Sequence, residues 1–139
     1  GAVTSVQGIT WTEYTLDGVS NHAGTTPMEL RHDAGYVAAA IGCEARRLAL
    51  DMGGDQRATV GVSELVPNIV NVIAKRARLT VDLRNTDDGL MTEAEERMTA
   101  FIAETAAAEA PPPLRRSHLQ AVVSDGLSDD LLWRPHTEL

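Results

Sequence analysis

Hydrophobic and polar positions repeat with two different periods along the chain, and these periods predict its elements. Residues 9–17 are rich in threonine and aromatic residues and contain no glycine or proline, which favours a β-strand. Apolar residues then recur at steps of three and four, as on one face of an amphipathic helix that ends at glycines 53–54: Leu30, Ala34, Val37, Ile41, Ala45, Leu48 and Met52. The opposite face of this helix is expected to be polar and carries Glu44, Arg46, Arg47 and Asp51.

We expect this first helix to begin near Pro27. Thr26 is a good N-cap residue, Pro27 suits the first helical position, and Glu29 stands three residues after the cap, so that a capping box is predicted. The polar loop 18–24, which precedes it, contains one titratable side chain, His22, which can donate or accept a proton near neutral pH. By its spacing alone, His22 is more often a surface-loop histidine than a functional group.

Two further strands are predicted after the first helix. Residues 57–66 alternate between apolar and polar positions and lead into a turn at Pro67 and Asn68. Residues 75–84 alternate more strictly, and one face of this segment carries Ala77, Leu79, Val81 and Leu83. Such alternation is typical of a sheet that is covered on one side only.

The remaining elements are a second helix and a final edge strand. Apolar residues return to helical spacing between 90 and 108, with Asp88 or Thr92 as the expected cap, and three prolines at 111–113 end this helix. Residues 119–123 are short and β-branched enough for a last strand. The order strand, helix, strand, strand, helix, strand predicts an α+β, ferredoxin-like two-layer sandwich (βαββαβ) with two helices on one face of a four-stranded antiparallel sheet.

The composition of the chain indicates its domain count, the partners that it disfavours and its expected compartment. The 139 residues suit one domain, which we assign to 1–123, and leave 124–139 as a tail of unassigned structure. Twelve basic residues against twenty acidic ones give a formal net charge of −8, which disfavours nucleic acid or an anionic membrane as partner. With neither an apolar run near 20 residues nor a signal-peptide pattern, we expect a soluble, cytoplasmic chain. The single cysteine, Cys43, falls within the helical pattern and is expected to be a small packed thiol.

No metal site is predicted within the chain. A hydrolytic metal centre needs about three clustered His, Asp, Glu or Cys ligands. The four histidines are scattered, and none pairs with another at a spacing that would present both on one face of a helix or strand: His22, His32, His118 and His136.

Several linked motifs in fixed order carry a resemblance to a known family. They are Gln7-Gly8-Ile9-Thr10-Trp11-Thr12-Glu13, Asn21-His22-Ala23-Gly24-Thr25-Thr26-Pro27-Met28, Arg31-His32-Asp33-Ala34, Ala58-Thr59-Val60-Gly61, Pro67-Asn68, Asn71-Val72-Ile73 and Val81-Asp82-Leu83-Arg84. Through them, residues 5–110 resemble the smaller domain, called the lid or dimerisation domain, of the amidase/hydantoinase/carbamoylase family of zinc-dependent amidohydrolases. Several motifs in a fixed order identify a family much more specifically than any single motif does.

The resemblance implies a function that the spacing does not. It implies that the chain is a fragment of a larger homodimeric hydrolase, whose two divalent metal ions, of the zinc or manganese type, are held by a separate domain. It also implies that His22 stabilises the oxyanion in the partner subunit's active site, while Asn71 and Arg84 bind the substrate carboxylate. The implied reaction is hydrolysis of the C–N bond of N-carbamoyl L-amino acids, which are small molecules. Allantoate amidohydrolase and β-ureidopropionase are the alternatives within this class.

Other interpretations of these residues remain open. Without the resemblance, Arg84 reads as a solvated arginine at a strand end that pairs with Asp82 or Asp87, and Asn71 as a turn residue bonded to its own backbone. A ferredoxin-like domain can also stand alone as a ligand-sensing or oligomerisation module. The sequence departs from the family at Ala74, where members usually carry proline, so that a looser turn around Asn71 is expected.

Overall fold

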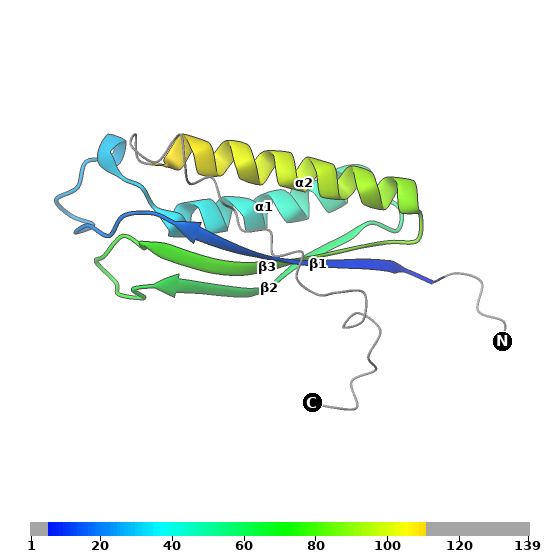
Figure 1. The fold of residues 1–139 in the computed structure, drawn as a ribbon, viewed down its shortest axis with the longest axis horizontal. Helices are drawn as coiled ribbons and strands as arrows, with labels where there is room; N and C mark the ends of the chain where they lie inside the picture. Colours follow the sequence, from blue (N-terminus) through cyan, green and yellow to red (C-terminus); the bar gives the residue numbers. More distant parts are fainter. Residues whose placement is uncertain (1–5, 111–139) are drawn as a thin grey trace, which may run out of the picture.

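A computed structural model describes residues 6–110 as a three-stranded antiparallel sheet with two helices on one face (Figure 1). The elements are β1 (Gly8–Asp17), a short 3-10 helix η1 (Met28–Leu30), α1 (Ala34–Met52), β2 (Arg57–Val66), β3 (Arg76–Asn85) and α2 (Asp88–Glu109). The α+β class and the helices on one face are confirmed. The described strands number three, in the order β1-β3-β2, rather than the predicted four, and residues 119–123 and 124–139 lie outside the described part.

The core lies between the sheet and the helices. The central strand β3 alternates as predicted, and the apolar residues that it buries are Ala77, Leu79, Val81 and Leu83. Tyr14 and Leu16 of β1 extend this surface, against which α1 and α2 pack their buried side chains, chiefly Ile41, Leu48, Met98 and Ile102. Because one face of each element is apolar with the period of that element, the layers bury their hydrophobic faces against each other.

The first helix begins at Ala34, and the prediction that it begins near Pro27 was wrong. The carboxylate of Asp33 accepts hydrogen bonds from the amides of Gly35 (2.8 Å) and Tyr36 (3.2 Å), and these two bonds fix the start of α1. Pro27 instead precedes the isolated turn η1, which has no side-chain cap. Leu30 therefore lies outside the helix, and 59% of its surface is exposed.

Three other expectations about the helices were wrong. The N-cap of α2 is Asp87, whose carboxylate accepts from the amide of Leu90 at 2.9 Å, rather than Asp88 or Thr92. Cys43 is exposed, whereas Glu44, placed on the polar face by its charge, is only 7% exposed. The boundary of a helix face depends on where its neighbours pack, and Glu44 can be buried because Arg47 donates two hydrogen bonds to its carboxylate, both at 2.7 Å.

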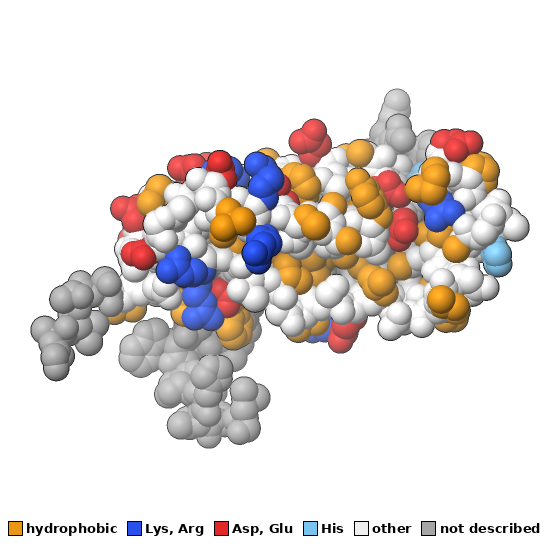
Figure 2. Space-filling model, turned by 180° about the vertical axis from the view of Figure 1, so that it is seen from behind, with side chains coloured by type: hydrophobic (Ala, Val, Ile, Leu, Met, Phe, Trp, Pro, Cys, Tyr) orange, Lys and Arg blue, Asp and Glu red, His pale blue; other side chains and the backbone are white. Residues whose placement is uncertain are grey.

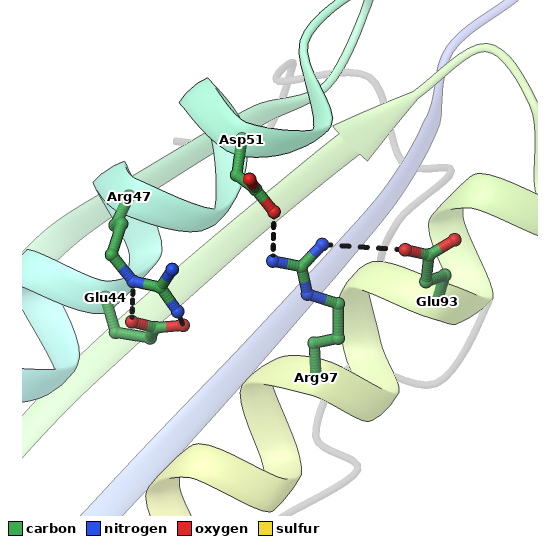
Figure 3. A network of polar contacts seen from close by, with 5 residues as sticks. All are labelled: Glu44, Arg47, Asp51, Glu93 and Arg97. Carbon is green, nitrogen blue, oxygen red and sulfur yellow. Dashed lines mark hydrogen bonds and ion pairs between the residues drawn. The ribbon is translucent and has the colours of Figure 1, made fainter.

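A polar network joins the two helices at their outer surface (Figure 3). Arg97 of α2 donates to Asp51 of α1 at 2.6 Å and pairs with Glu93, one turn earlier in its own helix, at 3.5 Å. The hydrogen bond from Arg97 lowers the pKa of the Asp51 carboxyl.

Neither α1 nor α2 is long and apolar enough to cross a membrane.

Candidate functional site

Two loops carry His22 and Asn71, and the backbone joins them at one end of the sheet. His22 and Val72 form an isolated antiparallel bridge. The amide of Ala23 donates to the carbonyl of Asn71, and the amide of Ile73 donates to the carbonyl of Asn21, both at 2.9 Å. The structure therefore brings His22 and Asn71 together, although 48 residues separate them in the sequence.

One hydrogen bond to the His22 ring indicates which of its two nitrogens can donate. The amide of Gly24 donates to Nδ1 of His22 at 3.0 Å. A neutral imidazole has one protonated nitrogen, so an acceptor at Nδ1 assigns the proton to Nε2. Within residues 6–110 no other group binds this exposed side chain, and Nε2 is left as a free N–H donor. Figure 2 shows a histidine at the surface at one end of the molecule.

Glycine at position 24 allows this close contact. A Cβ atom added there would lie 3.1 Å from Cε1 and 3.3 Å from Nδ1 of His22, closer than ordinary van der Waals contact. The turn is closed further by Thr26, whose hydroxyl donates to the carbonyl of His22 at 2.7 Å and whose amide donates to it at 3.2 Å. The hydroxyl predicted to cap a helix thus holds the histidine loop.

Arg31 also binds this loop, a contact that was not predicted from the sequence. Its Nε donates to the carbonyl of Thr26 at 3.1 Å, and its Nη2 donates to the carbonyl of Ala23 at 2.5 Å. Arg31 belongs to the quoted motif Arg31-His32-Asp33-Ala34, which was the available signal, but no spacing rule links an arginine side chain to carbonyls five and eight residues earlier.

Asn71 is exposed, and among the described residues its side-chain amide has no hydrogen-bond partner. The bond to its own backbone, which the turn interpretation requires, is therefore not formed. The carboxamide is free to donate to a ligand beside His22. The segment is held despite Ala74, because the carbonyl of Ala74 accepts the amide of Ala34 at 3.1 Å, in addition to the two bonds to the histidine loop.

Arg84 lies at the other end of β3. Its guanidinium pairs with the carboxylate of Asp82 through Nε (2.9 Å) and Nη2 (2.8 Å), so the expected pairing with Asp82 is present. Trp11 donates to the same carboxylate at 2.6 Å. From Arg76, at the end where the two loops meet, to Arg84 the strand rises by about 26 Å, at about 3.3 Å per residue. One copy of the chain therefore does not bring Arg84 to His22.

The described residues hold no candidate metal centre. No three His, Cys, Asp or Glu side chains between positions 6 and 110 come together in a way that could bind an ion. Nδ1 of His32 lies 2.7 Å from the carbonyl of Glu109, and the neighbouring carboxylate of Asp33 caps α1. The His32 ring thus joins the segment before α1 to the end of α2, and the Asp33 carboxylate fixes the start of α1.

Several known proteins that are similar to this chain are amidohydrolases. No protein-family model matches. The N-carbamoyl-L-amino acid amidohydrolase of Geobacillus stearothermophilus is 35% identical over 127 residues, which cover 86% of this chain and 29% of the relative. The allantoate amidohydrolase of Escherichia coli is 36% identical over 98 residues, covering 70% of the chain and 24% of the relative.

A solved structure extends the similarity to the fold. The chain superimposes on an amidase of the hydantoinase/carbamoylase family from Burkholderia multivorans with a TM-score of 0.74 and 37% identity, over 76% of this chain and 26% of that one. The chain thus spans about a quarter of the length of the proteins that it matches. By sequence and by fold, the chain belongs to the hydantoinase/carbamoylase family of amidohydrolases, as a homologue of one part of its members.

Proposed function

We propose that this chain is the lid and dimerisation domain of a metal-dependent amidohydrolase that cleaves the C–N bond of an N-carbamoyl L-amino acid. The observation that carries the proposal is His22, whose Nε2–H is exposed and whose ring is fixed by the amide of Gly24. The names of the relatives support the substrate class. The 36% identity to an allantoate amidohydrolase supports a related ureido acid, such as allantoate, as the alternative substrate.

His22 supplies hydrogen-bond donation where negative charge develops. When the oxygen of water bonds to the carbamoyl carbon, the carbonyl oxygen becomes an oxyanion, and the Nε2–H donates to it. The C–N bond then breaks, and the departing nitrogen takes a proton. A donor that is already oriented needs no rearrangement as the charge forms. The metal ions of the family would activate the water, and the described residues offer no site for them; in this proposal, residues 6–110 supply hydrogen-bond donors.

Asn71 and Arg84 bind the substrate carboxylate in this proposal, and their separation requires two copies of the chain. A carboxamide adds a neutral donor, and a guanidinium presents a fork that matches a carboxylate. Because Arg84 lies about 26 Å along β3 from the end that carries Asn71, both cannot reach one small molecule from the same copy. Arg84 of one copy acts with His22 and Asn71 of the other.

A two-fold dimer formed through β2 satisfies this requirement. Among the described strands, β2 is an edge, and it pairs only with β3. The helix beside it, α1, exposes Tyr36, Cys43 and Leu50 at intervals of seven residues, which is a continuous stripe on a helix. If two β2 edges pair antiparallel, each β3 runs antiparallel to its copy. Arg84 then lies at the same end of the joined sheet as the second copy's His22, and the two β3 strands are about 14 Å apart across three strand spacings.

The proposal is tested in the intact hydrolase that contains this domain. His22→Ala should lower kcat for an N-carbamoyl amino acid by about 10²–10³-fold, the usual effect of losing one oxyanion donor, with the metal content unchanged. Mixing His22→Ala subunits with subunits inactivated in the metal site should restore activity, since one active site of the mixed dimer is then complete. Verified mixed dimers that stay inactive would exclude action across the dimer.

A further inference from the structure

The guanidinium of Arg31 binds backbone carbonyls instead of a carboxylate. In a chain with eight more acidic than basic residues, the other arginines with side-chain hydrogen bonds mostly pair with Asp or Glu, as Arg47, Arg76, Arg78, Arg84 and Arg97 do. Arg31 forms no ion pair within residues 6–110. Its two hydrogen bonds go to the carbonyls of Ala23 and Thr26, on the two sides of Gly24.

One of these carbonyls belongs to the peptide group that binds the histidine ring. The carbonyl of Ala23 and the amide of Gly24 are the two ends of one planar peptide unit. Arg31 binds the carbonyl end at 2.5 Å, and Nδ1 of His22 accepts from the amide end at 3.0 Å. Rotation of this peptide plane would break both bonds together. The orientation of the plane therefore decides whether Nδ1 of His22 has a donor.

We propose that Arg31 is a positioning residue that orients the Ala23–Gly24 peptide and thereby keeps the proton of His22 on Nε2. The inference rests on the proposed function of His22 as oxyanion donor. The positive charge on Arg31 polarises the Ala23–Gly24 peptide. Hydrogen bonds linked in series, as from Arg31 through this peptide to His22, strengthen one another. The second bond, to Thr26, fixes the guanidinium plane, and the carbonyl of His22 is held in turn by the hydroxyl and amide of Thr26.

Arginine suits this task better than lysine. Its planar fork presents N–H groups in fixed directions, so that one side chain binds two carbonyls at a fixed relative angle. An ammonium group is a point donor without that geometry. Arg31→Lys should therefore keep the charge and part of the effect, whereas Arg31→Met removes every donor at similar side-chain length.

The first test is a double-mutant cycle in the intact hydrolase. Arg31→Met should lower kcat by about 10- to 100-fold with little change in KM, since misplacing a catalytic group by about 1 Å has effects of this size. Arg31→Lys should fall between wild type and Arg31→Met. In the His22→Ala background, Arg31→Met should have no further effect on kcat, because Arg31 acts through His22. An equal loss in both backgrounds would show that Arg31 acts independently and would overturn the proposal.

Arg97→Met is the matched control, because Arg97 is also partly buried but binds carboxylates on α1 and α2. It should leave kcat and KM unchanged. If His22→Ala itself leaves kcat unchanged, the proposed function fails. The tautomer of the His22 ring, measured separately as described next, still tests the role of Arg31. A loss of kcat in Arg97→Met as large as that in Arg31→Met would assign the effect to general destabilisation and would also overturn the proposal.

The second test reads the ring directly in the 139-residue chain. With ¹⁵N-labelled histidine, the His22 signal, assigned by its loss in His22→Gln, should show a protonated Nε2 and an unprotonated Nδ1 in wild type. In Arg31→Met and Arg31→Lys, the two tautomers should exchange, and the population with a proton on Nε2 should fall. A tautomer population unchanged in both variants would overturn the role assigned to Arg31.

Discussion

A carboxylate site divided between two copies can be tested by complementation. We expect Asn71→Ala and Arg84→Ala subunits of the intact hydrolase to be poorly active alone but to recover activity when mixed. In a mixed dimer, one site combines the intact Arg84 of one copy with the intact Asn71 of the other, and the second site lacks both. Half of the dimers in an equal mixture are mixed, and half of their sites are complete, so about one quarter of wild-type activity should return.

The expected magnitude for each parent follows from the bonds that it loses. A hydrogen bond to a charged group contributes about 1.5–3 kcal/mol, so Arg84→Ala should raise KM by about 10- to 150-fold, and Asn71→Ala should raise it less. Initial rates at a substrate concentration far below the wild-type KM make this loss visible. Subunits with two different affinity tags allow mixed dimers to be isolated, and these should have about half of wild-type activity.

A matched control uses two residues from the same loop pair. Because His22 and Asn71 lie side by side in one copy, His22→Ala and Asn71→Ala subunits should not complement each other. Recovery in this control, or no recovery with Arg84→Ala, would refute the division. The second result would mean that Arg84 and Asn71 serve one site from the same copy, against the length of β3.

Three further predictions concern single residues. Gly24→Ala should displace the His22 ring by several tenths of an ångström and lower kcat about 10-fold in a steady-state assay, with KM unchanged. Asp33→Ala should lower the free energy of unfolding by about 1 kcal/mol in urea titrations, because α1 loses its cap, and Asp33→Asn should lower it less. The Asp51 carboxyl should titrate below 3.8 by NMR and return toward that value in Arg97→Met. Since its folded pKa is lowered, its stabilising effect is present at neutral pH and is lost as pH falls through that pKa.

The sequence predicts the strands of this fold better than it predicts where the first helix begins. The three described strands agree with prediction to within one residue, because the alternation of Ala77, Leu79 and Val81 follows directly from burial on one side. The start of α1 was misplaced because two candidate caps compete locally. Asp33 forms two cap bonds, whereas the Thr26 hydroxyl binds the carbonyl of His22 instead.

The candidate site could be predicted only in its residues, not in its geometry. His22, Asn71 and Arg84 came from motifs, but the contact between the loops of His22 and Asn71 depends on backbone bonds that have no sequence signature. The contribution of Arg31 was missed for the same reason. The remoteness of Arg84, by contrast, follows from the ten-residue length of the third strand and was available from the sequence.

The segment from Gly18 to Asp33 is fastened to the rest of the domain at both its base and its tip. At the base, Gly18 donates to the carbonyl of Lys75 at 2.8 Å, and Val19 donates to the carbonyl of His32, also at 2.8 Å, which holds the two ends of the segment together. The tip is joined to the loop that carries Asn71. Such a segment moves with its domain rather than as an independent flap. Under the proposed function, a motion that carries His22 toward a substrate would therefore move the sheet and both helices together as one rigid body.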